Sequence, residues 1–432
     1  MSCVVVVNDC AAVPVTGGPV AVRTRKTSYG ERNFQLNFGH VAEGLPRQFT
    51  DREMDWLETI AHLFAVDLAC QRGEGDVAWA RDIEAYLPVR DPEYWNGITT
   101  AIEGIFSDFT FDRLRLHFVQ EADPIAPPRQ RTQAFHDHDC VALLSGGVDS
   151  YVGAARLLAE GRIPLAVSHT AAGAISHAQS EVEHVLVRQS PTFERAGLTA
   201  RKLGATFPAP EPSQRSRSFL FLAAALAAAA VLEVDEVFIN ENGVMAIHVP
   251  MTPARLGSLS THTASPLVMS RVASLASEVL GRDLAISNNL LTLTKPEVVE
   301  VGASLGLADS LSVTVSCWAI GRTSEHCGVC APCMMRRISF LLAGVDDAVY
   351  TTDIFSDPAA LERDSAADNL VHLVRLIQEI EAGSDLELQL SYPELLNGGS
   401  ALSVDDTLDL YRRWAGQAAS ILFQHPIPNS VR

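Results

Sequence analysis

One short stretch decides the fold of this chain, and it reads Val141-Ala142-Leu143-Leu144-Ser145-Gly146-Gly147-Val148-Asp149-Ser150. The four apolar residues at its start predict a short buried strand, and the apolar residues after Ser150 recur at helical spacing. The two adjacent glycines predict a turn whose backbone N–H groups surround an anion at the positive end of that helix. A Walker loop would carry a Lys after its last glycine, whereas here Asp149 stands between the glycines and the helix.

The order Ser-Gly-Gly-Val-Asp-Ser resembles the PP-loop of ATP pyrophosphatases, which cut ATP between the α and β phosphates and adenylate a substrate. The resemblance implies the following ATP-binding residues: Leu144, Ser145, Gly146, Gly147, Val148, Asp149, Ser150 and His169. We expect the hydroxyls of Ser145 and Ser150 to donate to phosphate oxygens. Asp149 is expected to help hold Mg²⁺, which takes oxygen ligands. His169 follows the next predicted strand, where it would flank the nucleotide or serve as a buried structural histidine.

Composition predicts a globular protein, with 47% hydrophobic and 20% charged residues. The 33 basic and 52 acidic residues give a net charge of −19, which argues against a broad nucleic-acid surface. The longest apolar run, residues 219–232, is too short to span a membrane and is read as a buried helix. The first residues carry no basic stretch, so we expect no secretory signal and a cytoplasmic location.

The chain is long enough for several domains, and three regions are expected. Residues 1–135 combine short strands with helices and predict an α+β accessory domain. Residues 136–345 alternate strand and helix, which predicts an α/β fold with a parallel sheet and helices on both faces. Residues 346–432 are predicted to be helical. The Pro-rich segment at 123–129 suggests the first boundary.

Strand patterns outside the loop lie at 4–7, 19–24, 33–38, 113–119, 163–169, 236–240 and 284–287. Helices are expected at 50–73, 95–106, 176–187, 219–232 and 403–422, with a longer amphipathic helix ending at Gly383. Thr50 and Glu53 match a capping box. Ser403 is expected to cap the last helix. Asp357, which precedes Pro358, is expected to cap another helix.

Four cysteines are spaced Cys-x9-Cys-x2-Cys-x2-Cys, at Cys317, Cys327, Cys330 and Cys333. Thiolates at this spacing can converge on one tetrahedral ion, and four of them leave no open position. The spacing therefore predicts a structural Zn²⁺, with an iron–sulfur cluster as the rival and His326 as an alternative to one cysteine. Clustered cysteines in a chain without a secretion signal favour metal binding over disulfides.

Two basic residues stand at helix starts, where the helix dipole disfavours positive charge unless an anion is near. Arg217 begins the apolar helix, and Lys295 follows Thr294 at the start of another. Each is expected to offset charge on phosphates during transfer, or else to be an ordinary surface residue. Glu241, Asn242 and Arg255 follow a predicted strand end and are tentative substrate residues, although a polar turn explains the first two as well.

Together, Ser145-Gly-Gly-Val-Asp-Ser150, Arg217-Ser-x-x-Phe, Thr294-Lys-Pro-Glu-Val-Val and the cysteine spacing resemble the QueC family of 7-cyano-7-deazaguanine synthases. The resemblance covers residues 140 to about 345. It implies Mg-ATP, structural zinc and a deazapurine carboxylate, which is adenylated, converted to an amide by ammonia and dehydrated to a nitrile. The short synthases lack the two flanking regions, and the amino-acid sequence of residues 240–255 also differs from theirs. The long form is closer to QueC-like proteins of anti-phage systems, the QatC type of QatABCD operons.

That resemblance implies an acyl-adenylate that an amine on a partner protein of the same system captures, with the flanking regions as docking surfaces. Three alternatives stay open: a synthase that uses ammonia, a tRNA-modifying PP-loop enzyme, and a nucleotide-binding subunit without catalysis. The acidic composition and the closed cysteine set argue against the tRNA enzyme, because sulfur transfer needs a reactive thiol.

Overall fold

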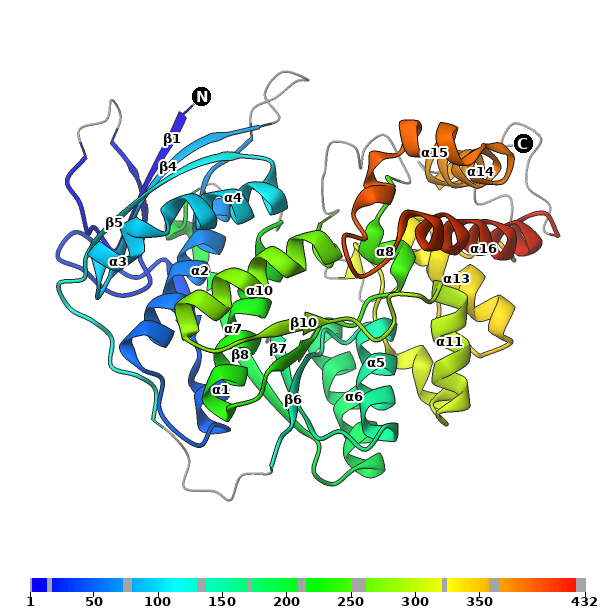
Figure 1. The fold of residues 1–432 in the computed structure, drawn as a ribbon, viewed down its shortest axis with the longest axis horizontal. Helices are drawn as coiled ribbons and strands as arrows, with labels where there is room; N and C mark the ends of the chain where they lie inside the picture. The colour runs from blue at the N-terminus through cyan, green and yellow to red at the C-terminus, as the bar shows by residue number, and fades with distance from the viewer. Residues whose placement is uncertain are drawn as a thin grey trace.

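The computed structural model describes residues 2–13, 18–72, 80–129, 137–169, 173–208, 211, 215–250, 262–320, 325–356 and 366–424. Within these ranges the chain forms two sheets that share one hydrophobic core, and a group of helices at the C-terminal end (Figure 1).

The larger sheet has six strands in the order β10-β9-β6-β7-β8-β3. Its strands are β3 (Phe34–Asn37), β6 (Cys140–Leu143), β7 (Pro164–His169), β8 (Glu194–Lys202), β9 (Glu236–Phe238) and β10 (Ala285–Ser287). All neighbours are parallel except β3, which pairs antiparallel with β8. The parallel sheet confirms the predicted α/β class. The order places β6 in the middle, so that the loop after it lies at the carboxyl edge of the sheet.

β8 was missed from the sequence, since its residues Glu-Arg-Ala-Gly-Leu-Thr-Ala-Arg-Lys look polar. Alternation was nevertheless present: Ala196, Leu198 and Ala200 are buried and the residues between them are not. β3 was predicted as a strand of the N-terminal region, and the structure adds it to the larger sheet.

Helices cover both faces of this sheet. One face carries α5 (Val148–Ala159), α6 (Ala174–Gln189) and α11 (Lys295–Ser304); the other carries α7 (Arg217–Leu232), α2 (Asp51–Ala69) and α10 (Pro266–Leu280). α7 is rich in alanine and almost wholly buried, because it lies between the sheet and α2. It confirms the predicted core helix. No helix in the described ranges is both long and apolar enough to cross a membrane.

The smaller sheet is parallel, in the order β2-β1-β4-β5. Its strands are β1 (Ser2–Val7), β2 (Val20–Val22), β4 (Asp82–Val89) and β5 (Arg113–Gln120), accompanied by α3 (Pro92–Gly97) and α4 (Thr99–Thr110). The short helix α1 (Gly39–Glu43) contacts β8 and α7 of the larger layer instead. α2 lies between the two sheets, and its Thr50–Glu53 capping box is confirmed. The helix predicted at 95–106 is wrong in its bounds, since α3 and α4 meet at Ile98.

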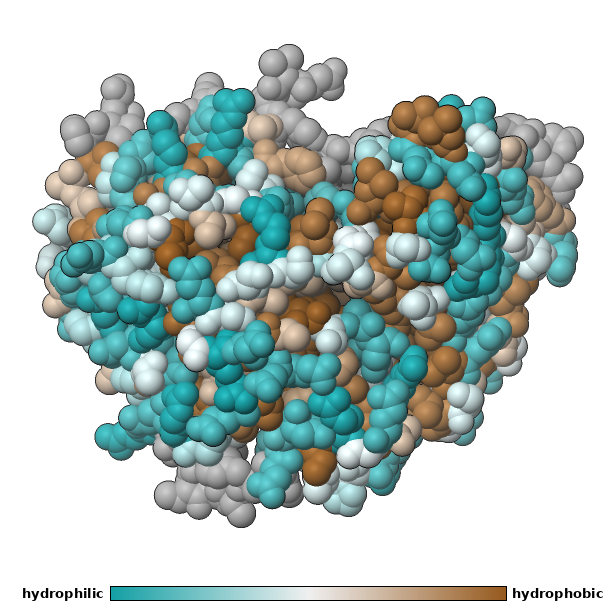
Figure 2. All heavy atoms as spheres, viewed as in Figure 1, coloured by the Kyte–Doolittle hydropathy of each residue, from teal (hydrophilic) through white to brown (hydrophobic). Residues whose placement is uncertain are grey.

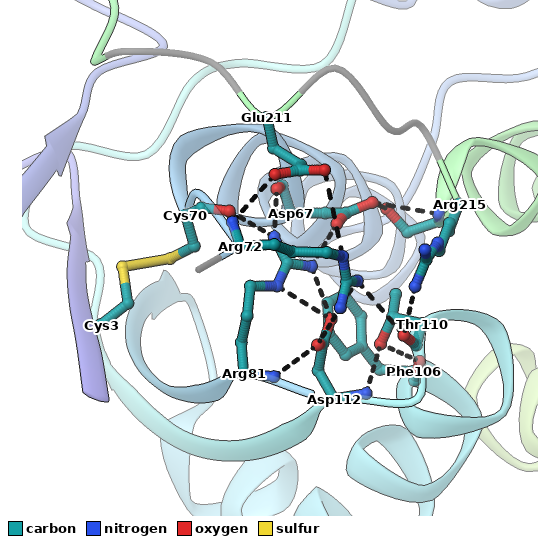
Figure 3. Close-up of polar contacts among 11 residues, drawn as sticks. Cys3, Asp67, Cys70, Arg72, Arg81, Phe106, Thr110, Asp112, Glu211 and Arg215 are labelled. Carbon is teal, nitrogen blue, oxygen red and sulfur yellow. Dashed lines mark hydrogen bonds and ion pairs between the residues drawn. A yellow bond between two sulfur atoms is a disulfide. The ribbon is translucent and has the colours of Figure 1, made fainter. Parts of the chain in front are cut away.

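A buried ion network ties this sheet to α7 (Figure 3). The carboxylate of Asp112 accepts hydrogen bonds from both Arg72, at 2.8 and 2.9 Å, and Arg81, at 3.1 and 2.5 Å. Arg81 also donates to Asp67, at 2.6 Å, and Asp67 accepts from the hydroxyl of Ser216 beside α7, at 2.8 Å. Buried charges are tolerated where each is paired in this way. The network therefore fixes α2 against the start of α7.

Cys3 of β1 and Cys70 at the end of α2 form a disulfide next to this network. This pair lies outside the cysteine cluster for which the sequence favours metal over disulfides, and nothing local predicts it, because its members are 67 residues apart.

The C-terminal helices form a second core around Tyr411 and Trp414. They are α13 (Ala331–Ala343), α14 (Ala366–Ala382), α15 (Asp385–Ser391) and α16 (Val404–Leu422), joined by α8 (Gly243–Ile247) from the middle of the chain. Three short 3-10 segments, η1 (Gly204–Thr206), η2 (Ala308–Val313) and η4 (Pro393–Leu396), complete the described elements. Ser403 caps α16 as predicted, and α14 ends just before Gly383. The predicted cap at Asp357 lies outside the described residues.

Figure 2 shows hydrophobic side chains at the surface over α15. Leu396 of η4 and two leucines of α15, Leu386 and Leu390, are each more than half exposed. Leu388 on the same helix is buried, so α15 has apolar residues on both its inner and its outer side.

We predict that Asp112→Ala destabilises the protein by about 3–5 kcal/mol, because Arg72 and Arg81 would remain buried without their shared carboxylate. Urea unfolding followed by circular dichroism measures this. Asp82→Ala is the matched control, since its partner Arg113 lies 3.8 Å away and is exposed, and we expect a change below about 1 kcal/mol. Equal unfolding midpoints for the two variants would contradict the role given to the network.

Candidate active site

The loop after β6 has the geometry that the sequence predicted. Gly147 caps α5, which begins at Val148, so that Asp149 lies in the first turn of the helix. Gly146 has a φ of +86°, and a Cβ there would lie 3.1 Å from the side chain of Gln179. Both constraints favour glycine. The loop thus leads directly into the N-terminus of α5, which suits a phosphate.

The two serines of the loop hold its shape. Ser145 Oγ and Ser150 Oγ lie 3.0 Å apart, and Ser145 Oγ accepts a hydrogen bond from the N–H of Gly147 at 3.3 Å. Leu144 and Val148 are buried in the core that faces α5 and α6. Leu144 therefore has only its backbone to offer a ligand, whereas Val148 is also part of the cavity described below.

Asp149 is the centre of a buried polar cluster. Its Oδ2 accepts hydrogen bonds from Lys295 Nζ at 2.6 Å and from Asn242 Nδ2 at 3.1 Å. Its Oδ1 receives no hydrogen bond from an N–H or hydroxyl group within the described residues. The carboxyl of Glu241 is in hydrogen-bonding contact with Asp149. Asp149, Lys295, Glu241 and Asn242, all singled out from the sequence, are thus brought together.

The two carboxyls of this cluster hold different charges. Burial raises the pKa of Glu241 well above its usual value, and the neighbouring charge of Asp149 raises it further. Burial also acts to raise the pKa of Asp149, but the Lys295 ammonium and the hydrogen bonds that Asp149 accepts hold it below its usual value. Asp149 is therefore the ionised carboxylate, and the proton on Glu241 lets it donate to Asp149.

A cavity of about 210 Å³ opens beside this cluster. It is lined by Ser145, Gly147, Val148, Asp149, Ser150, Asn240, Glu241, Met245, Lys295, Val315, Ser316, Trp318, Pro332 and Met335. The loop and the two carboxyls form one side, and the segment that carries the cysteines forms another. The donor set suits Mg²⁺ with a phosphate, since two carboxyls supply oxygen ligands and the helix N-terminus and Lys295 supply positive charge.

Arg217 and His169 lie together at a different place. Both contact the ring of Phe221, with the ring of His169 stacked at 5.3 Å and the guanidinium of Arg217 at 5.7 Å from the centroid. Burial lowers the pKa of His169, and the charge of Arg217 lowers it further. Neither is among the described residues that line the cavity. Arg255 lies outside the described residues.

The sequence analysis missed two residues of the cavity that carry chemistry. Asn240 follows shortly after β9 (Glu236–Phe238), and its buried side-chain amide has no hydrogen-bond partner within the described ranges. It packs directly on α5, where a Cβ at Gly153 would lie 2.2 Å from it. Trp318, beside the first cysteine, is 54% exposed. The sequence shows that Trp318 is next to Cys317, but it does not show that the Trp318 side chain faces the cavity.

The last described helix, α16, is hydrogen-bonded to the segments that carry Lys295 and Asn242. Thr294, the N-cap residue of α11, donates its hydroxyl proton to Gln417 of α16 at 2.7 Å. Tyr411 of α16 donates to the carbonyl of Val244 at 2.9 Å and accepts from the N–H of Val249 at 2.8 Å. α16 therefore holds both the helix that begins with Lys295 and the segment that follows Asn242.

The four cysteines converge as predicted. Cys317, Cys327, Cys330 and Cys333 place their sulfur atoms within 4.8 Å of one another. Cys317 Sγ accepts hydrogen bonds from the N–H groups of Ala319 and Cys327, at 3.2 and 3.3 Å, a common arrangement around metal-bound thiolates. The donor set fits a tetrahedral Zn²⁺.

His326 is not part of this cluster, so the alternative that it replaces a cysteine is wrong. Its Nε2 accepts a hydrogen bond from the N–H of Ser316 at 3.1 Å, and its ring contacts Tyr350.

The cysteine segment is bonded directly to the loop. The N–H of Val315 donates to the carbonyl of Gly146 at 2.9 Å. Arg336 of α13, fully buried, donates to the carbonyl of Thr314 at 3.0 Å and to Asp347 at 2.7 Å. Residues 314–317 therefore connect the phosphate loop to the first cysteine.

We predict one zinc ion per chain, and its loss in Cys330→Ser, because three sulfur ligands hold the ion far less tightly than four. Elemental analysis of the purified protein measures it. Cys140→Ser, a buried cysteine far from the cluster in sequence, is the control and should retain the metal. Iron with a visible absorption band in place of zinc would favour the cluster alternative, and metal-free wild-type protein would refute the site.

Part of the chain is similar in sequence to a known protein family. Residues 209–344 match the family described as "Queuosine biosynthesis protein QueC". The 7-cyano-7-deazaguanine synthase of Hydrogenovibrio crunogenus is 32% identical over 127 residues, which cover 29% of this chain and 51% of that protein. The synthase of Methylobacillus flagellatus is 36% identical over 119 residues, covering 28% of this chain and 48% of that protein.

The chain thus spans about half the length of these relatives. The family match contains Lys295, Glu241 and the four cysteines, whereas the loop at 145–150 lies before it. Residues 209–344 are thus similar to the QueC family, and the α/β fold around this segment is consistent with that similarity.

Proposed function

We propose that this protein uses ATP to adenylate a 7-deazapurine carboxylate of the 7-carboxy-7-deazaguanine type, with release of pyrophosphate. The observation that carries the proposal is the position of Asp149. It stands in the first turn of the helix behind the loop, bound to Lys295 and beside Glu241, in a cavity that the cysteine segment closes.

In the proposed reaction, a carboxylate oxygen of the substrate attacks the α-phosphorus of ATP. The bond from the α-phosphorus to the bridging oxygen breaks, and pyrophosphate leaves with its electron pair. The N-terminus of α5 binds phosphate oxygens, and Lys295 offsets the charge that develops on them. Catalysis of this kind rests on positioning and electrostatics.

Asp149 and Glu241 are the residues that would hold Mg²⁺, which supplies charge neutralisation on the phosphates when bound. Oδ1 of Asp149 is available to it, because Lys295 and Asn242 both occupy Oδ2. Glu241 has to give up its proton to become a second oxygen ligand.

The acyl-adenylate would then pass its acyl group to an amine: the nitrogen attacks the acyl carbon, and AMP leaves. For the acceptor we propose an amine on a partner protein of the same anti-phage system. The support is the long form of the chain, in which the matched segment is flanked on both sides by described elements such as α2 and α16. A protein acceptor gives a stable amide.

A second candidate is a synthase that uses ammonia and proceeds to the nitrile. It is favoured by the names of the relatives, which are 7-cyano-7-deazaguanine synthases. Mass spectrometry of the products formed from ATP, 7-carboxy-7-deazaguanine and ammonium separates the two. A nitrile supports the synthase, whereas an adduct on a copurified protein supports the partner acceptor.

We predict that Asp149→Ala lowers pyrophosphate release in the presence of 7-carboxy-7-deazaguanine by more than about 100-fold, since Lys295 loses its counter-charge and Mg²⁺ a ligand. A coupled pyrophosphate assay measures this, and zinc content should not change. Asp405→Ala is the matched control, because this exposed aspartate also lies in the first turn of a helix. Wild-type release in the Asp149 variant would refute the assignment.

A further inference from the structure

Trp318 is unlike the other tryptophans that the structure describes. Trp56, Trp95 and Trp414 are at most 1% exposed and belong to hydrophobic cores. Trp318 is 54% exposed and lines the cavity that contains Ser145 and Asp149. The side chain of tryptophan has a large apolar surface, and its partial exposure inside a cavity leaves this surface within reach of a ligand.

The backbone on both sides of Trp318 is fixed. On one side, the N–H of Val315 donates to Gly146 in the phosphate loop. On the other, the N–H of Ala319 donates to Cys317 Sγ in the cysteine cluster. The backbone that carries the indole is therefore placed by the two motifs that define the site, and it cannot shift far without breaking one of these bonds.

The cavity has chemically distinct parts. Asp149, Glu241, Lys295 and the buried amide of Asn240 make one part polar and charged. Trp318, Met335, Pro332 and Met245 supply apolar surface to the same cavity. A ligand that suits both parts carries a planar apolar ring and an anionic group. Purine-type bases with a phosphate or carboxylate have this composition, and base stacking on an aromatic side chain is a strong, sequence-tolerant contact.

We propose that Trp318 is the base-stacking residue of this site, with its indole packed against the purine-type ring of a substrate. The ring belongs either to ATP or to the deazapurine, which share this chemistry. The proposal rests on the proposed function for the ligand class, but the exposure and position of Trp318 are independent of it.

The experiment measures binding to the full-length protein in two separate arms, one with Mg²⁺ and the non-cleavable α,β-methylene analogue of ATP, the other with 7-carboxy-7-deazaguanine alone. Calorimetry gives the dissociation constants for wild-type protein, Trp318→Ala, Trp318→Phe and the control Tyr29→Ala, an exposed aromatic of the N-terminal region. Zinc content and circular dichroism verify that each variant is folded.

We expect Trp318→Ala to weaken binding about 5- to 150-fold in one arm, and Trp318→Phe to restore most of it, since phenylalanine also stacks. The arm in which the dissociation constant increases shows whether Trp318 stacks on the adenine of ATP or on the deazapurine. The same ligand should quench the tryptophan fluorescence of wild-type protein more than that of Trp318→Phe.

Wild-type affinities in both arms for folded Trp318→Ala would overturn the stacking role and leave the proposed function standing. Wild-type protein that binds neither ligand would overturn both. Weakening by Tyr29→Ala to the same extent would also overturn the proposal, because the effect would not be specific to the cavity.

Discussion

The site depends on one ion pair, between Lys295 and Asp149 at 2.6 Å. Both residues stand at helix starts, α11 and α5, so two positive helix ends meet at one point. A buried ammonium between them would be strongly unfavourable without the carboxylate. The pair settles the charge of the neighbouring residues, since with Asp149 ionised Glu241 keeps its proton. The cluster is thus suited to an anion.

The rest of the chain supports this pair. The six-stranded sheet places the loop at its carboxyl edge, and α7 fills the opposite face with alanines that let helix and sheet pack closely. α16, from the end of the chain, bonds to Thr294 and to the backbone around α8, which holds Lys295 and Asn242 in place. The cysteine segment reaches the loop through Val315. The flanking regions therefore contribute to the site through packing, whatever partner they contact.

Local rules predicted the elements whose signals are local. The glycines of the loop, the capping boxes and the cysteine spacing each specify geometry within a few residues, and the structure reproduces them. The pairing of strands and cysteines that are far apart in the sequence could not be predicted from local patterns. β8 alternates small apolar residues with charged ones, and β3 joins it from the N-terminal region. Cys3 and Cys70 meet only because β1 packs beside α2.

The same distinction applies to the site residues. Asp149 and Lys295 were found because each sits in a recognisable motif. Asn240 and Trp318 were not predicted from the sequence. They line the cavity because of the direction in which their side chains leave a turn, and no local motif specifies that direction. Arg217 was selected for its position at a helix start, and in the structure it contacts Phe221 instead of lining the cavity.

The central claim is that the cavity activates a carboxylate on the α-phosphate of ATP. Exchange of labelled pyrophosphate into ATP, measured without an amine acceptor, tests it most directly, because only a reversible adenylation returns the label to ATP. We expect exchange that requires 7-carboxy-7-deazaguanine. No exchange under these conditions, with ADP and phosphate as the products of ATP, would contradict the account.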